Sequence, residues 1–302
     1  MRKKAFGCTK SGEKTYLYCL ENHNHMSIGV TNYGAHLVFV KVPDKNGVQR
    51  DVVLGYDDVS GYEEDTYCLG ATIGRNANRT KNARFTLNGQ VYELDKSEAS
   101  NNCHSGPNGY QFRIWNAKQL SDTEVQFSLI SPHLDQGFPG KFLVSTTYTL
   151  TEENEIIIHY EGMSSEDTVV NLTHHSYFNL NGHDSGNILG QFLKIKAKEY
   201  SPIEDEQSIP TGERAAVTGT AMDFRSFKMI GCDIYSEEQQ LKLAGDYNHS
   251  FWIDKPVNSL GLMAEAYSRE SGICLRAKTD LPAVQLYTGL LLCSIAAGLP
   301  DL

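Results

Sequence analysis

Hydrophobic and polar residues alternate with a period of two along most of this chain. Residues 141–150 and 155–160 are rich in β-branched and aromatic side chains, and the polar turn between them predicts a hairpin. Residues 84–87 and 90–94 flank an Asn-Gly pair, which supplies the two positive φ angles that a type I′ turn requires. The pattern therefore predicts antiparallel strands joined by tight turns.

Further strands are predicted by the same pattern, and helices are few. The best helix candidate is residues 236–245, which open with a capping box of Ser236 and Gln239 and end at a glycine. Because strands and helices do not alternate, the sequence predicts an all-β protein, a large antiparallel β-sandwich. Without a linker or repeat, residues 1–302 are expected to form a single domain. The other predicted strands are residues 37–42 and 52–54 around Asn46-Gly47, then 125–130, 168–172, 192–197, 251–254 and 273–277.

The charge of the chain argues against two classes of partner. With 27 Lys and Arg against 37 Asp and Glu, the formal net charge is −10, whereas nucleic acid and anionic membranes usually recruit a basic face. We therefore expect neither partner, and no apolar stretch approaches the roughly 18 residues of a membrane span. The seven cysteines include no C-x-x-C pair, which favours reduced thiols and a cytoplasmic location.

Candidate chemistry is concentrated in three polar segments. In residues 171–182, His174 and His175 are neighbours on a predicted strand and must point to opposite faces. His175, Tyr177 and Asn179 then share a face, where an imidazole can act as a general acid or base near neutral pH. The alternative is a hydrogen-bonded histidine at a strand end, and this segment alone does not exclude it.

The other two segments are rich in turns and hydrogen-bond donors. Residues 101–109 carry His104, and residues 73–80 carry two arginines and two asparagines, which suit a hydroxyl-rich or anionic ligand. Either segment can equally be a surface loop. Metal ligation by the histidines is the weaker interpretation, because the sequence has neither an H-x-x-x-H nor an H-E-x-x-H spacing.

Taken in order, these segments resemble one family, the aldose 1-epimerases or galactose mutarotases. The resemblance runs from about Thr31 to Gly289, and Asn171–Leu180 (Asn-Leu-Thr-His-His-Ser-Tyr-Phe-Asn-Leu) is its most specific part. The remaining motifs are Asn32–Ala35, Asp51–Tyr56, Ile73–Arg79, Cys103–Gly106, Gly137–Gly140, Ile209–Glu213 and Val284–Gly289.

The resemblance implies a β-sandwich enzyme of carbohydrate metabolism that interconverts the α and β anomers of free hexoses such as galactose and glucose, without a metal or organic cofactor. In that family a glutamate removes the proton of the anomeric hydroxyl and a histidine protonates the ring oxygen. By motif, the acid is His175, and His104 is the second active-site histidine. The sugar-binding residues carried over are Asn78, Arg79 and Gln285, together with Asn248 at a position where the family usually has aspartate.

Two departures from the family pattern bear on activity. Asn248 lacks the charge of the usual aspartate, which predicts weaker or altered sugar binding. The family's catalytic glutamate lies downstream of the Tyr-Thr-Gly motif, and residues 290–302 contain no glutamate. We therefore expect a truncated epimerase domain that lacks its C-terminal strands and shows strongly reduced mutarotation.

Two alternatives follow from these departures. One is a sugar-binding module that has lost the catalytic base, and the other is an epimerase for a sugar phosphate that is held by Arg75 or Arg79. The sequence leaves the preferred aldose open, as well as the choice between monomer and homodimer.

Overall fold

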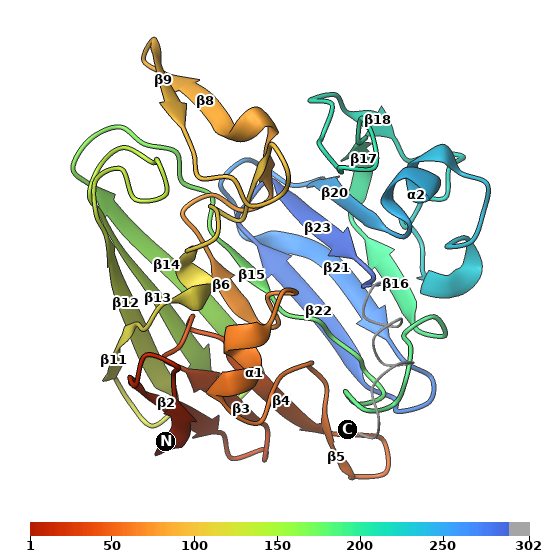
Figure 1. Cartoon of the computed structure of the whole chain (residues 1–302). Helices are drawn as coiled ribbons and strands as arrows, with labels where there is room; N and C mark the ends of the chain where they lie inside the picture. The colour runs from red at the N-terminus through yellow and green to blue at the C-terminus, as the bar shows by residue number, and fades with distance from the viewer. Residues whose placement is uncertain (290–302) are drawn as a thin grey trace. The chain divides into compact units, whose positions relative to one another are not determined.

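The computed structural model describes residues 1–289, which form two compact units whose regular secondary structure is almost wholly β-strand (Figure 1). Unit 1 comprises Met1–Pro43 and Gly47–Phe178. Unit 2 comprises Asp44–Asn46 and Asn179–Leu302, described as far as Gly289. The all-β prediction is confirmed, whereas the single domain spanning residues 1–302 stays a prediction.

Unit 1 contains two main sheets and three strand pairs, all antiparallel. The five-stranded sheet joins, in sequence order, β1 (Arg2–Cys8), β2 (Lys14–Glu21), β3 (Ser27–Thr31), β4 (Leu37–Pro43) and β5 (Gln49–Asp51). The four-stranded sheet joins β11 (Asn116–Gln119), β12 (Glu124–Ser131), β13 (Phe142–Leu150) and β14 (Ile156–Ser164). The pairs are β6 (Ala71–Ile73) with β15 (Thr173–His175), β7 (Arg79–Thr80) with β10 (Asn102–Cys103), and β8 (Arg84–Leu87) with β9 (Gln90–Glu93). Helix α1 (Val59–Glu64) and 3₁₀ turns η1 (Lys81–Ala83) and η2 (Tyr110–Phe112) complete the unit.

The two main sheets of unit 1 pack through the apolar face of each strand. Tyr18 of β2 meets Phe127 of β12 edge to face, with ring centroids 5.6 Å apart. Tyr148 of β13 is fully buried and donates a hydrogen bond to the carbonyl of Ala35 at 2.7 Å. Because alternate residues point to opposite faces, this burial leaves the other face of each strand for polar side chains.

Unit 2 contains two four-stranded antiparallel sheets around one core. One sheet has the order β19 (Lys228–Met229), β16 (Phe192–Ile195), β21 (Gly261–Tyr267), β22 (Cys274–Thr279). The other has the order β18 (Ala215–Ala216), β17 (Ala197–Ser201), β20 (Asn248–Ile253), β23 (Ala283–Tyr287). The 3₁₀ turn η3 (Ile230–Cys232) and helix α2 (Gln239–Ala244) lie outside the sheets. The core includes Ile195, Phe224, Tyr247 and Phe251.

Most of the predicted hairpins and strands are confirmed. β13 pairs with β14 and β8 pairs with β9, and both residues of the Asn88-Gly89 turn have positive φ, 52° and 79°. β12, β20 and β22 match the strands predicted over residues 125–130, 251–254 and 273–277 to within a few residues.

Four local predictions are wrong in detail. Residues 168–172 form no strand, and β15 begins only at Thr173. Residues 192–197 split into β16 and β17, which belong to different sheets. The partner strand of β4 is β5, which ends before the predicted residues 52–54, although the Val52 amide still donates to the Val40 carbonyl of β4 at 2.9 Å. The predicted capping box fails because helix α2 begins three residues later, after Glu238, without a side-chain cap. Its glycine end is confirmed, since Gly245 has a φ of 78°.

The expectations about residues 290–302, including the missing glutamate and missing C-terminal strands, lie outside the described residues. Neither α-helix of residues 1–289 has the length and hydropathy that crossing a membrane would require.

Candidate active site

His175 lies at the end of β15, where this strand pairs with β6. The pairing sets His175 opposite Ala71, and the His175 carbonyl accepts a hydrogen bond from the Gly70 amide at 3.0 Å. His174 points the other way and binds the Tyr148 hydroxyl through Nε2 at 2.9 Å. The prediction that the two histidines face opposite sides is therefore confirmed, and His175 is the one left for the site.

Two aromatic side chains surround the His175 ring. The centroid of the Tyr177 ring is 5.2 Å away, although β15 ends at His175 and does not include Tyr177. The centroid of the His104 ring is also 5.2 Å away, with the two imidazole planes at 86°. Asn179 does not join them, because its side chain binds the Gly186 carbonyl and Gln191 within unit 2. The structure thus brings together the two histidines that the sequence selected.

His104 is held by a closed pair of hydrogen bonds to Asn78. Its amide donates to the Asn78 carbonyl at 3.1 Å, and the Asn78 amide donates to His104 Nδ1 at 3.2 Å. Both residues have positive φ, 50° at His104 and 65° at Asn78, so each backbone turns sharply at the contact. Pairing of β7 with β10 brings these two segments side by side.

Burial disfavours a positive charge on both imidazole rings. It lowers the pKa of His104 to about 3, and the neighbouring His175 and Arg79 add to the effect. Burial also lowers the pKa of His175, although its own main-chain hydrogen bond and the Asp65 carboxylate act in the opposite direction. Of the two rings, His175 therefore has the surroundings that better tolerate a proton.

Arg79 is oriented by a carboxylate that the sequence analysis did not select. Its Nε and Nη2 donate to the two carboxylate oxygens of Glu98, at 2.6 and 3.1 Å. The Asn78 Oδ1 accepts from the Arg79 amide at 2.9 Å. The Asn-Arg pair is thus fixed next to His104. Nothing in the sequence near Glu98 marks it as the partner, since 19 residues separate it from Arg79.

The remaining two predicted residues lie together on one face of unit 2. Gln285 of β23 donates from Nε2 to Asn248 Oδ1 of β20 at 2.8 Å, and its Oε1 accepts from the Ser250 hydroxyl at 2.5 Å. Asp246, two residues before Asn248, is buried and does not replace it on this face. The structure therefore presents a ladder of neutral polar groups around Asn248.

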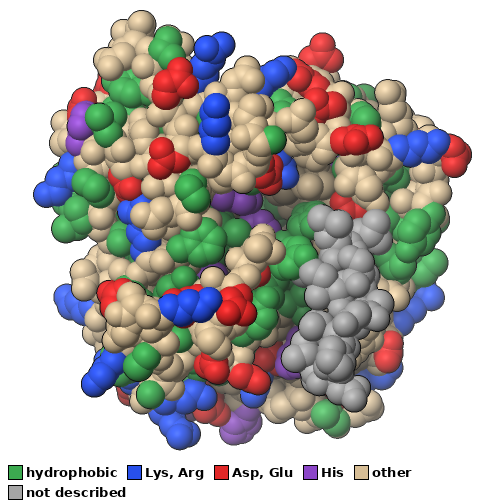
Figure 2. Space-filling view, viewed as in Figure 1, with side chains coloured by type: hydrophobic (Ala, Val, Ile, Leu, Met, Phe, Trp, Pro, Cys, Tyr) green, Lys and Arg blue, Asp and Glu red, His purple; other side chains and the backbone are tan. Residues whose placement is uncertain are grey.

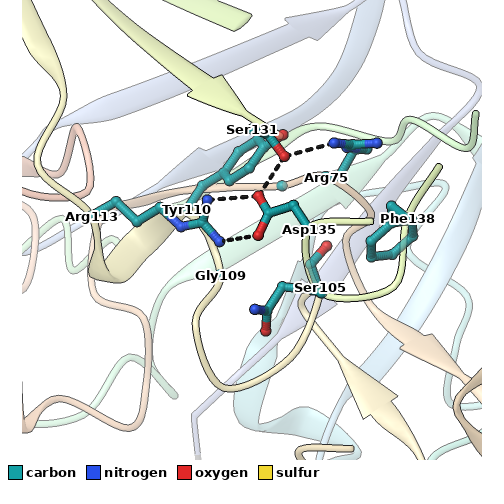
Figure 3. Close-up of a pocket in the computed structure, with 10 residues that line it drawn as sticks. Arg75, Ser105, Gly109, Tyr110, Arg113, Ser131, Asp135 and Phe138 are labelled. Carbon is teal, nitrogen blue, oxygen red and sulfur yellow. Dashed lines mark hydrogen bonds and ion pairs between the residues drawn. The ribbon is translucent and has the colours of Figure 1, made fainter. Parts of the chain in front are cut away.

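Arg75, the other candidate for an anionic ligand, is buried inside unit 1 (Figure 3). Its guanidinium donates to the Pro139 carbonyl at 2.5 Å and to the Ser131 hydroxyl at 2.6 Å. Ser131 in turn donates to Asp135, which also forms a bidentate ion pair with Arg113. These contacts make Arg75 an internal anchor of unit 1.

The surface around these elements carries charges of both signs. Figure 2 shows Lys and Arg interspersed with Asp and Glu on this face, and histidine side chains that reach the surface among hydrophobic ones. Across residues 1–289, no three His, Cys, Asp or Glu side chains converge to form a metal site.

Comparison with known proteins identifies one family. The sequence profile described as aldose 1-epimerase matches residues 16–298. The chain is 35% identical to the aldose 1-epimerase of Escherichia coli over 278 residues, which cover 92% of this chain and 80% of the relative. It is 37% identical to human galactose mutarotase over 287 residues, or 95% of this chain and 81% of the relative.

Solved structures give the same result. Galactose 1-epimerase from Lactobacillus acidophilus superposes with a TM-score of 0.83 at 27% identity, covering 96% of this chain and 83% of that one. An aldose epimerase homologue from C. elegans gives a TM-score of 0.80 at 31% identity, covering 90% and 81%.

Proposed function

Because this chain belongs to the aldose 1-epimerase family, an isomerase family, we propose that it binds free hexoses such as galactose or glucose and converts one anomer into the other. The observation that carries this proposal is the contact between His104 and His175, with ring centroids 5.2 Å apart, next to a fixed Asn78–Arg79 pair.

His175 is the proposed acid of ring opening. Its imidazolium gives a proton to the ring oxygen while a base removes the proton of the C1 hydroxyl, and the C1–O5 bond breaks to leave an aldehyde. Rotation about C1–C2 presents the other face of the carbonyl. The reverse proton transfers then close the ring as the opposite anomer.

The other residues bind and orient the sugar in this proposal. His104 donates a hydrogen bond near the ring oxygen, and Asn78 and Arg79 contact hydroxyl groups. Asn248 and Gln285 are proposed as further sugar-binding residues by their motifs, and their side chains offer neutral donors and acceptors. Neutral amides bind hydroxyl groups less strongly than a carboxylate does, so we expect weaker sugar binding than in relatives that have aspartate at the position of Asn248.

The proposed reaction still needs a base to remove the proton of the C1 hydroxyl. The 302 residues contain no glutamate after Glu270, and Asp301 is the one carboxylate that follows Tyr287. We propose that a polypeptide of these residues mutarotates sugars slowly, since a missing general base typically costs about 10²–10⁴ in rate. Polarimetry with fresh α-D-galactose measures this, and a rate equal to that of the E. coli enzyme would contradict it.

A second candidate function for this 302-residue polypeptide is that of a sugar-binding module. The module retains the sugar-binding residues and holds the sugar without turnover. Calorimetry beside polarimetry separates the two functions. Heat of galactose binding without any acceleration of mutarotation supports the module, and acceleration that disappears in His175→Gln supports the enzyme.

We also propose a cytoplasmic location. The six cysteines among the described residues are all free thiols, which suits a reducing compartment. Labelling of the native protein in intact cells with a membrane-impermeant thiol reagent tests this, because the exposed Cys8 and Cys274 react only if the protein lies outside the cytoplasm.

A further inference from the structure

The tautomer of His104 follows from its contact with Asn78. The group that faces Nδ1 is the main-chain amide of Asn78, at 3.2 Å, and an amide N–H can only donate. Nδ1 must therefore be the acceptor, and the single proton of the neutral ring lies on Nε2. Geometry alone makes His104 a donor at its outer nitrogen.

Ser105 holds the two segments that make this contact. Its hydroxyl accepts from the Asn76 amide at 2.7 Å and donates to the Asn76 carbonyl at 3.1 Å. The side chain is fully buried, with 1% of the residue exposed, so water does not compete for these bonds. The Asn76 amide and carbonyl lie two residues before Asn78, and Ser105 follows His104 directly. The Ser105 hydroxyl thus joins the segment that carries His104 to the segment that carries Asn78.

Neighbouring contacts fix the remaining side of the Asn76–Asn78 segment. The Ala77 amide donates to the Asn171 carbonyl at 2.9 Å, and the Asn171 amide donates to the Arg75 carbonyl at 2.9 Å. These bonds hold the segment on the side away from the loop that carries His104. On the side of that loop, the Ser105 hydroxyl bonds to Asn76 beside the two hydrogen bonds that join His104 to Asn78.

We propose that Ser105 is a positioning residue that holds His104 as the neutral Nε2–H tautomer, so that His104 is a fixed hydrogen-bond donor to the sugar and His175 alone of the pair carries the transferred proton. The sugar-facing part of this statement rests on the proposed function. Burial supports the neutral state independently, because it lowers the pKa of His104 to about 3, helped by His175 and Arg79. Two cationic rings in contact would repel each other, which the division of roles avoids.

Long-range ¹H–¹⁵N NMR of the full chain with labelled histidine tests the tautomer directly, without sugar. The wild type is expected to show His104 neutral, with a bare Nδ1 and a protonated Nε2, between pH 8 and pH 5. His104→Gln assigns the signal by its loss. In Ser105→Ala we expect a mixture of tautomers, a His104 pKa closer to 6.5, and a galactose Kd raised up to about tenfold for one lost hydrogen bond.

Two further variants complete the test. Ser105→Gly removes the hydroxyl but suits the positive φ of 69° at this position, so it keeps the test valid if the alanine variant fails to fold. Ser271→Ala removes another buried serine hydroxyl, which accepts from the Ile273 amide in unit 2, and should leave the His104 spectrum unchanged.

Three results overturn the inference or part of it. An Nδ1–H tautomer in the wild type contradicts the geometry, and an unchanged tautomer and pKa in the folded Ser105 variants contradicts the positioning role. A wild-type chain with the expected tautomer that binds no galactose contradicts the proposed function and the sugar-facing role of His104, while the tautomer assignment stands.

Discussion

The ion network around Asp135 gives the sharpest prediction about stability. Asp135 accepts two hydrogen bonds from Arg113, at 2.6 and 2.7 Å, and one from Ser131 at 2.5 Å, and Ser131 also accepts from Arg75 (Figure 3). Burial alone would raise the pKa of Asp135, but the bonds from Arg113 and Ser131 outweigh it, so the pKa lies below its usual value. The Asp135 carboxylate is thus the counter-charge of two arginines, Arg113 by direct contact and Arg75 through Ser131.

Asp135→Asn keeps the shape of the side chain and removes its charge. The Arg113 side chain is only 14% exposed and Arg75 is fully buried, so both cations lose their counter-charge where water cannot replace it. Removing one member of a buried pair typically costs about 3–5 kcal/mol. This is a large share of the roughly 5–15 kcal/mol that stabilises an ordinary domain.

Urea unfolding followed by circular dichroism measures this loss of stability. Asp223→Asn is the matched control, because Asp223 forms the same bidentate pair with Arg225, at 2.9 and 2.7 Å, with side chains that are 28% and 41% exposed. Its expected cost is about 0–1 kcal/mol. Equal costs for the two variants, or a cost below about 1 kcal/mol for Asp135→Asn, would refute the reasoning.

Three further predictions concern the site and its histidines. His175→Gln should remove whatever acceleration of mutarotation the chain shows, because glutamine keeps a hydrogen-bonding group but cannot transfer a proton, and polarimetry measures this. Asn248→Asp should lower the galactose Kd up to about tenfold in calorimetry, because a charged acceptor strengthens the bond to a hydroxyl. Burial lowers the pKa of His174 to about 3 and that of His249 to about 4, so the unfolded chain binds more protons below pH 6.5. Stability should therefore fall as the pH drops from 6.5 to about 4, by up to about 1.4 kcal/mol per pH unit for each histidine, and His249→Phe should flatten this slope in urea titrations.

Each of these predictions has a clear contrary result. Acceleration that survives in His175→Gln would assign the proton transfer to another group. A weaker or unchanged Kd in Asn248→Asp would mean that Asn248 does not face the sugar. An unchanged slope of stability against pH in His249→Phe would mean that His249 is not held neutral by burial.

Local sequence signals predicted the hairpins because the turn residues act on their own neighbours. Asn88-Gly89 sets two positive φ angles wherever the two strands pack, so the β8–β9 hairpin did not depend on distant contacts. The strand predicted over residues 168–172 failed for the opposite reason. Thr168 accepts a hydrogen bond from Arg75, 93 residues away, and Asn171 pairs with Asn76 in an isolated β-bridge. Tertiary contacts therefore determine the backbone conformation of residues 168–172.

The site was predictable where a motif carried it and not where a distant partner completes it. The motifs identified His104 and His175, and the structure puts their rings in contact. The sequence did not identify Glu98, which orients Arg79, or Ser105, which bonds to Asn76. Both contacts form only because β7 and β10 lie side by side in the fold. Periodicity alone misplaced Asn179, because the strand that carries His175 ends four residues earlier.

The most direct test of this account measures mutarotation and binding together, with fresh α-D-galactose, the 302-residue chain, and the E. coli aldose 1-epimerase as reference. We predict that calorimetry detects galactose binding while polarimetry gives a rate at least about 100-fold below the reference. A rate equal to the reference would contradict the proposed lack of a base, and no detectable binding would contradict the proposed sugar site.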